Sequence, residues 1–451
     1  MRYRYMIPAA FALVALAGCN NVLDTAPSNR VLASQEIVDQ PSAEAALNGA
    51  YDALQSSGAY GLDIEMLGDL PADNLTWVGT YQFLGNIEDN QIAADNPEVT
   101  DMWEALYRQI DRDNVIIEKV PTVASIPDDA KAEIMGEAYL LRALSYHNLV
   151  KFWGGVPMPL APVTVAQDAS KYTRASVADV YTQILSDLDN AEQRISSTDV
   201  FRANVSAVNA IRSRVLFYRA STPGANAAAD YQGALDAANA VLAGRDTLTV
   251  PYPDLFSANG TETADDIMRV RFTESEENDL GYYYQYEGRF ETAPTTNLVT
   301  TYEPGDLRKA WSIALRPRST TRYQGMKFPT TIGTESPHVI RLAELVLIKA
   351  EVLARQNDLA GAVAEYNKVR VRAGLAPHVL GVDVTTQAEV LAAIEKERRL
   401  ELAFEGDRWP DLVRLGQAQQ VKGFTKPGYV LFPIPLRDIT TTPGLTQNPD
   451  Y

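Results

Sequence analysis

Apolar residues recur with a helical period over about residues 33–242. When successive residues are placed about 100° apart, two sets of mostly apolar positions each fall on a single helix face. The first set is Trp103, Leu106, Ile110 and Ile117, and the second is Ile134, Ala138, Leu141, Ser145 and Leu149. Further helices are predicted over 177–195 and 205–220, with proline and glycine residues at the joints. The pattern therefore predicts a mostly helical first half.

A helix–turn–helix unit is predicted over residues 345–377. Ala350, Ala362 and Tyr366 recur at the small, small and aromatic spacings of a tetratricopeptide repeat, with residues 357–358 in the turn. Small residues let two helices approach closely, while the aromatic ring fills the space beside them. Because residues 230–238 resemble the second helix of another such pair, we expect several stacked helix pairs.

The helical period disappears between about residues 246 and 337. This segment has a strand-like stretch at 267–272 and four tyrosines within residues 282–286. A long irregular segment in a compact protein is more often functional than disordered, and its aromatic residues argue against disorder. We therefore expect loops and short strands that lie against the helical frame.

Charged residues near the C-terminus occupy positions that should be apolar. One narrow helix face carries two aliphatic residues and three carboxylates, namely Val390, Ile394, Glu397, Glu401 and Glu405. A solvated helix would turn such charges outward, and unpaired buried carboxylates are costly. The pattern predicts a buried structural ion network, with Arg398 and Arg408 as its counter-charges.

The same stretch resembles the C-terminal signature of the SusD/RagB family, the surface lipoproteins with which Bacteroidota capture nutrients. The matching motifs are Glu397-Arg398-Arg399, Glu401-Leu402, Glu405-Gly406, Arg408-Trp409, Phe432-Pro433-Ile434-Pro435 and Asn448-Pro449-Asp450-Tyr451. The resemblance implies a mostly α fold, a single SusD-like domain over 19–451 with stacked tetratricopeptide-like helix pairs and an irregular insert. Its parts are an N-terminal helical part (33–245), an irregular ligand-side insert (246–337) and C-terminal repeat-like helices (338–451).

The resemblance also implies a binding protein and not an enzyme. Such a receptor captures an oligosaccharide or another nutrient oligomer, such as a peptide, and delivers it to a SusC-like TonB-dependent β-barrel transporter. Two alternatives stay open: a secreted glycosidase or peptidase, and a periplasmic tetratricopeptide-type scaffold that binds proteins. The three histidines lack metal-ligand spacing, and no GxSxG, HExxH or GxxxxGK motif is present. We therefore expect no catalytic residues, cofactor or metal.

The N-terminus has the pattern of a secretory signal. A charged start and an apolar run from Met6 lead to Leu16-Ala17-Gly18-Cys19, which resembles the bacterial lipobox. We expect a lipoprotein signal peptide at 1–18 and a lipid on Cys19, the single cysteine of the chain. The family resemblance implies a lipid-anchored protein of the cell outer membrane that faces outward.

The whole chain is acidic, with a formal net charge of −18 and a pI of about 4.7. This balance argues against nucleic acid or an anionic polysaccharide as the main ligand. A neutral ligand is therefore expected from the overall charge.

Aromatic residues outside the framework motifs are the candidates for ligand contacts. Because sugars present C–H faces ringed by hydroxyls, a sugar site needs exposed rings with amide or guanidinium donors nearby. The candidates are Asn74, Trp77 and Tyr81 in one loop, and Tyr283, Tyr284, Tyr286, Arg289 and Trp311 in the insert. In an alternating strand, Tyr284 and Tyr286 would point to the same face. We expect both groups to converge on one surface, away from the repeat-like helices.

Overall fold

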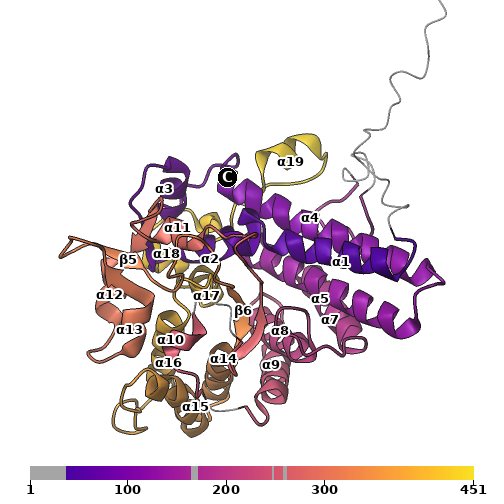
Figure 1. The fold of residues 1–451 in the computed structure, drawn as a ribbon. Coiled ribbons are helices and arrows are strands. Elements are labelled where there is room, and N and C mark those ends of the chain that lie inside the picture. The colour runs from indigo at the N-terminus through magenta and orange to yellow at the C-terminus, as the bar shows by residue number, and fades with distance from the viewer. Residues whose placement is uncertain (1–36, 164–170, 246–247, 257–261) are drawn as a thin grey trace, which may run out of the picture.

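The computed structural model describes residues 37–163, 171–245, 248–256 and 262–451. The signal peptide expected at 1–18 and the lipidation site Cys19 lie outside these ranges. Most of the described chain is helical (Figure 1), which confirms the mostly α class. No helix in the described ranges combines the length and the apolar character needed to cross a bilayer.

The long helices pack against their neighbours in chain order. They are α1 (Gln40–Leu54), α4 (Pro97–Lys119), α5 (Asp128–Trp153), α7 (Val177–Glu192), α8 (Val205–Arg219), α9 (Ala227–Leu242), α14 (Leu342–Arg355), α15 (Leu359–Arg372) and α16 (Gln387–Glu401). Helix α4 packs on α5, α5 on α7, α8 on α9, and α14 on α9, α15 and α16. Side-chain caps set their starts: Asn96 accepts hydrogen bonds from the first turn of α4, and Thr386 forms a capping box with Glu389 at α16.

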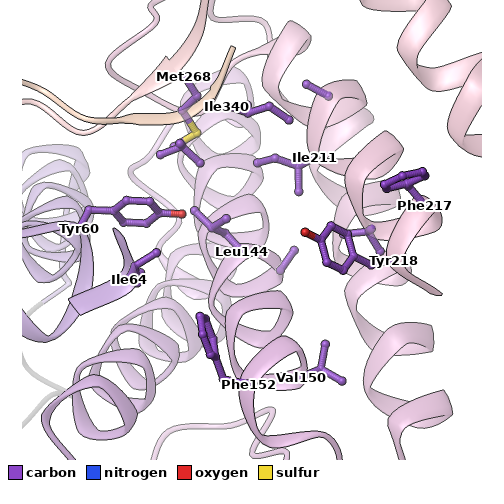
Figure 2. Close-up of a cluster of buried hydrophobic side chains, with 14 of the residues drawn as sticks. Tyr60, Ile64, Leu144, Val150, Phe152, Ile211, Phe217, Tyr218, Met268 and Ile340 are labelled. Atoms are coloured by element: carbon purple, nitrogen blue, oxygen red, sulfur yellow. The ribbon is translucent and has the colours of Figure 1, made fainter. Parts of the chain in front are cut away.

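Helix α5 is the centre of the helical frame. The sequence suggested one apolar face, yet every residue from Gly136 to Trp153 except Tyr139 is buried. A helix that is buried on all sides must be surrounded by other elements, and α1, α4, α7 and α8 all contact α5. Figure 2 shows the core where η2 (Ser57–Gly61), α2 (Asp63–Asp69) and α5 meet α8 and two short strands. Its labelled members include Tyr60, Ile64, Leu144, Ile211, Met268 and Ile340.

The expected helix–turn–helix unit is confirmed as α14 and α15. Ala350, Ala362 and Tyr366 are fully buried between the elements of this pair and its neighbours. The connecting turn places Asn357 in the left-handed region, with φ of 66°, which asparagine tolerates better than most residues. Helices α8 and α9 form another antiparallel pair, and α9 packs on α14.

The segment expected to be irregular consists of short elements. They are α10 (Tyr252–Leu255), β2 (Asp266–Arg269), α11 (Leu280–Tyr284), β3 (Thr292–Pro294), α12 (Thr296–Thr301), α13 (Leu307–Ser312), β4 (Ile313–Leu315) and β5 (Tyr323–Gly325). Strand β2 pairs with β6 (His338–Arg341), and β4 pairs with β5. The strand expected through Tyr284 and Tyr286 is wrong, because hydrogen bonds from Tyr283 to Asp279 and from Gln285 to Gly281 form helix α11 instead.

The remaining elements complete the frame. They are β1 (Leu75–Trp77), α3 (Gln82–Glu88), η3 (Val120–Thr122), α17 (Arg408–Arg414), α18 (Ala418–Lys422), η4 (Pro427–Val430) and α19 (Leu436–Thr441). In Figure 1, α3, α11 and β5 lie together on one side of the molecule, while α14, α15 and α9 lie at its lower end. Helices α3 and α11 and strand β5 therefore lie apart from the repeat-like helix pairs, whereas β2 and β6 contact α8.

Candidate ligand-binding surface

Strands β1 and β3 bring the loop that follows Trp77 into contact with the insert. They pair antiparallel, with Leu75 opposite Pro294 and Trp77 opposite Thr292. The pairing continues past the strands, where the N–H groups of Val78 and Gly79 donate to the carbonyl oxygen of the same residue, Glu291, at 2.9 and 3.2 Å. Two segments that are far apart in the sequence thus form one local structure. The two groups of candidate residues can converge on one surface only if these segments lie together.

The carboxylate of Glu291 organises this structure. Its Oε2 accepts hydrogen bonds from the Trp77 indole N–H at 3.2 Å and from the backbone N–H groups of Thr80 and Tyr81, each at 3.0 Å. Its Oε1 accepts from Arg289 Nε at 2.9 Å. Burial raises the pKa of Glu291, but the Tyr81 amide, Arg289 and the indole outweigh it and hold the pKa below its ordinary value. The side chain is therefore an ionised anchor that orients both an indole and a guanidinium.

Tyr81, Tyr283 and Arg289 form an open group of rings and donors. The Arg289 guanidinium lies 5.0 Å from the Tyr81 ring centroid and 5.4 Å from that of Tyr283, and it donates to the Tyr283 hydroxyl at 3.3 Å. Both tyrosines are half-buried, and Arg289 is exposed. Phe83, which is 42% exposed, extends the group with an edge contact to Tyr81. We call Trp77, Tyr81, Tyr283, Tyr286 and Arg289 the candidate surface.

A buried pair of carboxyl groups lies beneath the candidate surface. Glu98 of α4 and Asp63 of α2 are buried close to each other and to the Tyr81 hydroxyl. Burial raises the pKa of both carboxyl groups, and the Glu98 charge raises that of Asp63 further. The buried acids therefore lie directly under the Tyr81 side of the candidate surface.

A second group of rings lies on the other side of the same insert segment. Arg316 stacks over Tyr286 at 4.3 Å and lies 5.6 Å from Phe290. The two rings contact each other edge to face, and the Tyr286 N–H donates to Gln324 of β5 at 3.2 Å. Phe290 has φ of 52°, an unfavourable conformation for an aromatic residue. Residues 282–291 therefore present rings on both sides, toward Tyr81 and toward the β4–β5 hairpin.

Two candidates are inaccessible to a ligand. Tyr284 is 1% exposed and packs against Phe328 and Phe404 in the core, because helix α11 turns its ring inward. Asn74 is fully buried, where its amide donates to Asp69 and its oxygen accepts from Arg399. Both residues support the surface from inside, and neither can contact a ligand in this conformation.

Trp77 and Trp311 differ from each other in setting. The Trp77 ring packs so closely on α3 that a Cβ added at Gly85 would lie 2.8 Å from it, and the side chain is only partly exposed. Trp311 is 41% exposed on α13, next to β4. Trp77 is thus held in the candidate surface by Glu291 and α3, whereas Trp311 borders the hairpin and makes none of the contacts that join the other rings.

The ion network expected near the C-terminus is buried as anticipated. Glu397, Glu401 and Glu405 are each at most 7% exposed in their side chains. The guanidiniums of Arg372, Arg341 and Arg308 overcome burial and lower the pKa of Glu401 to about 2. A carboxylate held ionised in this way cannot serve as the general acid of a glycosidase.

The expected counter-charges of this network were wrong. Glu397 pairs with Arg308 at 2.8 Å and with Arg370 at 2.6 Å. Glu401 pairs with Arg341 at 2.7 Å and with Arg372. Glu405 pairs with Arg341 and Lys327. Arg398 instead pairs with Asp411 at 2.8 Å, and Arg408 with Asp73 at 2.7 Å. The glutamates point toward β6, α13 and α15, while the two arginines leave their helices in other directions. The network is therefore larger than expected and ties the insert to the C-terminal helices.

The structure also contains a cleft elsewhere. It has a volume of about 450 Å³ and is lined by Trp103, Tyr107, Tyr172, Asp438 and other residues of α4 and of nearby loops. The Tyr107 hydroxyl in this cleft already has a partner within the protein, because it donates to the Pro157 carbonyl oxygen at 2.6 Å. This cleft is one alternative location for a ligand. Among the described residues, no group of three or more His, Cys, Asp or Glu side chains is arranged to hold a metal ion.

Sequence reasoning missed the residues that build the candidate surface from within. Glu291, Phe290 and Glu98 carry no motif, and their roles depend on contacts with distant segments. Arg316 offered a signal, since three arginines fall within residues 316–322.

Comparisons with known proteins match this chain to SusD-like proteins. Residues 22–217 match the family described as "Starch-binding associating with outer membrane", and residues 280–451 match the one described as "SusD family". The chain is 27% identical to the SusD-like protein P38 of Formosa agariphila, over 98% of this chain and 97% of that one. Among solved structures, a laminarin-binding SusD-like protein is similar at 23% identity, with a TM-score of 0.78 over 92% of this chain and all of that one. The surface glycan-binding protein A of Bacteroides fluxus is similar at 21% identity, with a TM-score of 0.77 and the same coverage.

Proposed function

Because the chain belongs to the SusD/RagB family, we propose that it is a lipid-anchored receptor that binds an oligosaccharide and delivers it to a SusC-like TonB-dependent transporter. A description of the matched family is starch binding in association with the outer membrane, and two similar structures are named for laminarin and glycan binding. The lipid on Cys19 anchors the protein, and the outer face of the outer membrane is where it meets its ligand.

The observation that carries the binding role is the open group of Tyr81, Tyr283 and Arg289. Rings of this kind bind the C–H faces of a sugar, and the guanidinium donates to its hydroxyls. Glu291 holds the group in place before a ligand arrives, so little conformational entropy is lost on binding. Tyr286 and Trp311 lie at the edge of this group. The further sugar units of a longer oligomer bind there.

Calorimetry on the mature chain tests the binding role. The panel contains laminari-, xylo- and manno-oligosaccharides, oligogalacturonate and mixed peptides. We expect at least one oligosaccharide to bind, and Tyr283→Ala to weaken it by about 1–3 kcal/mol at an unchanged melting temperature. Tyr283→Phe is the matched control, because it keeps the ring and loses only the hydroxyl. Binding of peptides alone, or equal binding by Tyr283→Ala, would contradict the proposal.

Two further experiments test anchoring and delivery. Cys19→Ala should release the protein from the membrane fraction, and protease treatment of intact cells should remove the wild-type protein. A tagged, detergent-extracted protein should co-purify with a TonB-dependent β-barrel under induced growth. New reducing ends during incubation with the bound oligosaccharide would instead favour a glycosidase.

A further inference from the structure

The turn between β4 and β5 carries three arginines without carboxylate partners. We call residues 316–322 the basic hairpin, after Arg316, Arg318 and Arg322. Within the described ranges, none of the three forms an ion pair, although the chain as a whole has a net charge of −18. Most other buried or half-buried arginines of this protein pair with Asp or Glu, so the half-buried Arg316 departs from the pattern of the molecule, and the exposed Arg318 and Arg322 add two unpaired charges beside it.

The backbone of the basic hairpin is well defined. The Arg316 N–H donates to the Arg322 carbonyl oxygen at 3.0 Å, and the Ser319 hydroxyl accepts from the Arg322 N–H at 2.9 Å. Arg318 has φ of 60°, a left-handed conformation that glycine adopts at less cost. The turn thus holds an arginine where the backbone alone favours a smaller residue. Observed strain of this kind points to a role for the side chain.

Arg316 connects the basic hairpin to the candidate surface. Its guanidinium lies over Tyr286 and near Phe290, and its Nε is buried without a hydrogen-bond partner among the described residues. The same insert segment carries Tyr283 and Arg289 on its other side. Arg318 and Arg322 are exposed beyond Arg316. Two acidic residues lie on this insert segment: Glu291, which pairs with Arg289, and Glu287, which is exposed and forms no ion pair with the three arginines.

We propose that the basic hairpin binds the anionic groups of an acidic oligosaccharide whose sugar rings lie on the candidate surface. This inference rests on the proposed function and specifies its ligand class. A guanidinium matches the planar carboxylate of a uronic acid and the oxygens of a sulfate ester through paired N–H donors. Arg289, whose charge is paired with Glu291, adds further N–H donors next to the rings. The overall charge suggested a neutral ligand, but recognition depends on the charges nearest the ligand, and within the described ranges the three arginines of the basic hairpin have no carboxylate partner.

Titration calorimetry with three probes tests the inference: oligogalacturonate for carboxylates, κ-carrageenan oligosaccharides for sulfate esters, and laminari-oligosaccharides as the neutral probe. The test variant is Arg318→Ala/Arg322→Ala, whose side chains are exposed and unpaired. The control is Lys119→Ala/Arg437→Ala, which removes two charges from surface pairs elsewhere. We expect one anionic probe to bind more tightly than the neutral one, with affinity that falls as salt is added. The test variant should lose about fivefold or more of that affinity, and the control should lose none.

Which anionic probe binds identifies the group that the arginines recognise. Tighter binding of laminari-oligosaccharides, or an unchanged affinity of the test variant for an anionic probe, overturns the inference and leaves the proposed function standing. Absence of binding by all three probes overturns the inference and counts against the proposed function as well. Equal losses in test and control variants show a general charge effect and also overturn it.

Discussion

Replacing Glu401 by glutamine removes the central charge of the buried ion network. Its side chain is fully buried and lies within 4 Å of three guanidiniums, those of Arg308, Arg341 and Arg372. Against the cost of burial, these groups lower its pKa from 4.5 to about 2, which corresponds to about 3 kcal/mol at neutral pH. Removing one partner from a buried ion network costs about 3–5 kcal/mol, because the remaining charges stay buried and unpaired. We therefore expect Glu401→Gln to lower the free energy of unfolding by about 3 kcal/mol or more at pH 7.

Urea unfolding at several pH values measures this effect. Because the folded-state pKa lies below the unfolded value, the contribution is complete above pH 4.5 and is lost as the pH falls toward 2. The difference between wild type and Glu401→Gln should therefore shrink between pH 5 and pH 3. Glu192→Gln is the matched control, since Glu192 is 52% exposed and its pair with Arg212 is worth less than about 1 kcal/mol. A difference below about 1 kcal/mol at pH 7, or one that does not change with pH, would refute the reasoning.

Four other substitutions test the fold. Burial raises the pKa of Asp69 to about 7, so stability should fall as the pH rises from about 4 to 7, and Asp69→Asn should lessen this fall in urea unfolding at pH 5 and pH 8. Tyr284→Ala should cost about 3–5 kcal/mol in the same assay, because it empties a core position, and a loss below 1 kcal/mol would place the ring outside the core. Gly68→Ala should prevent folding, since the added Cβ would lie 2.1 Å from the Gly406 carbonyl oxygen. Gly49→Ala in α1 places its Cβ in open space and should raise stability by about 0.5–1 kcal/mol in thermal unfolding.

The helical frame was largely readable from the sequence. The helices α4, α5, α14 and α15 have long apolar periods, and the small residues at the α14–α15 contact mark the pair. The charges of Glu397 and Glu401 also indicated burial, because helix geometry fixes which residues share a face. The placement of Glu405 on that helix face was wrong, because α16 ends at Glu401 and Glu405 reaches the same network from the turn that follows. The partners of these glutamates were not readable, since Arg308 and Arg341 come from segments whose position relative to α16 depends on the whole fold.

The candidate surface was only partly readable. The type of residue was informative, and Tyr81, Tyr283 and Arg289 do lie together. Periodicity failed for Tyr284, because four tyrosines in five residues fit a strand and a helical turn equally well. Glu291 gave no local signal, although it accepts four hydrogen bonds that build the site, because its donors come mainly from a segment distant in the sequence.

The account's central claim is that a glycan binds on the candidate surface. A crystal structure with the tightest-binding probe among oligogalacturonate, κ-carrageenan oligosaccharides and laminari-oligosaccharides tests it most directly. The account predicts a sugar ring stacked on Tyr81 or Tyr283, with Arg289 in hydrogen-bond contact with the ligand. A sugar in the cleft lined by Trp103 and Tyr107, with the candidate surface unoccupied, would contradict it.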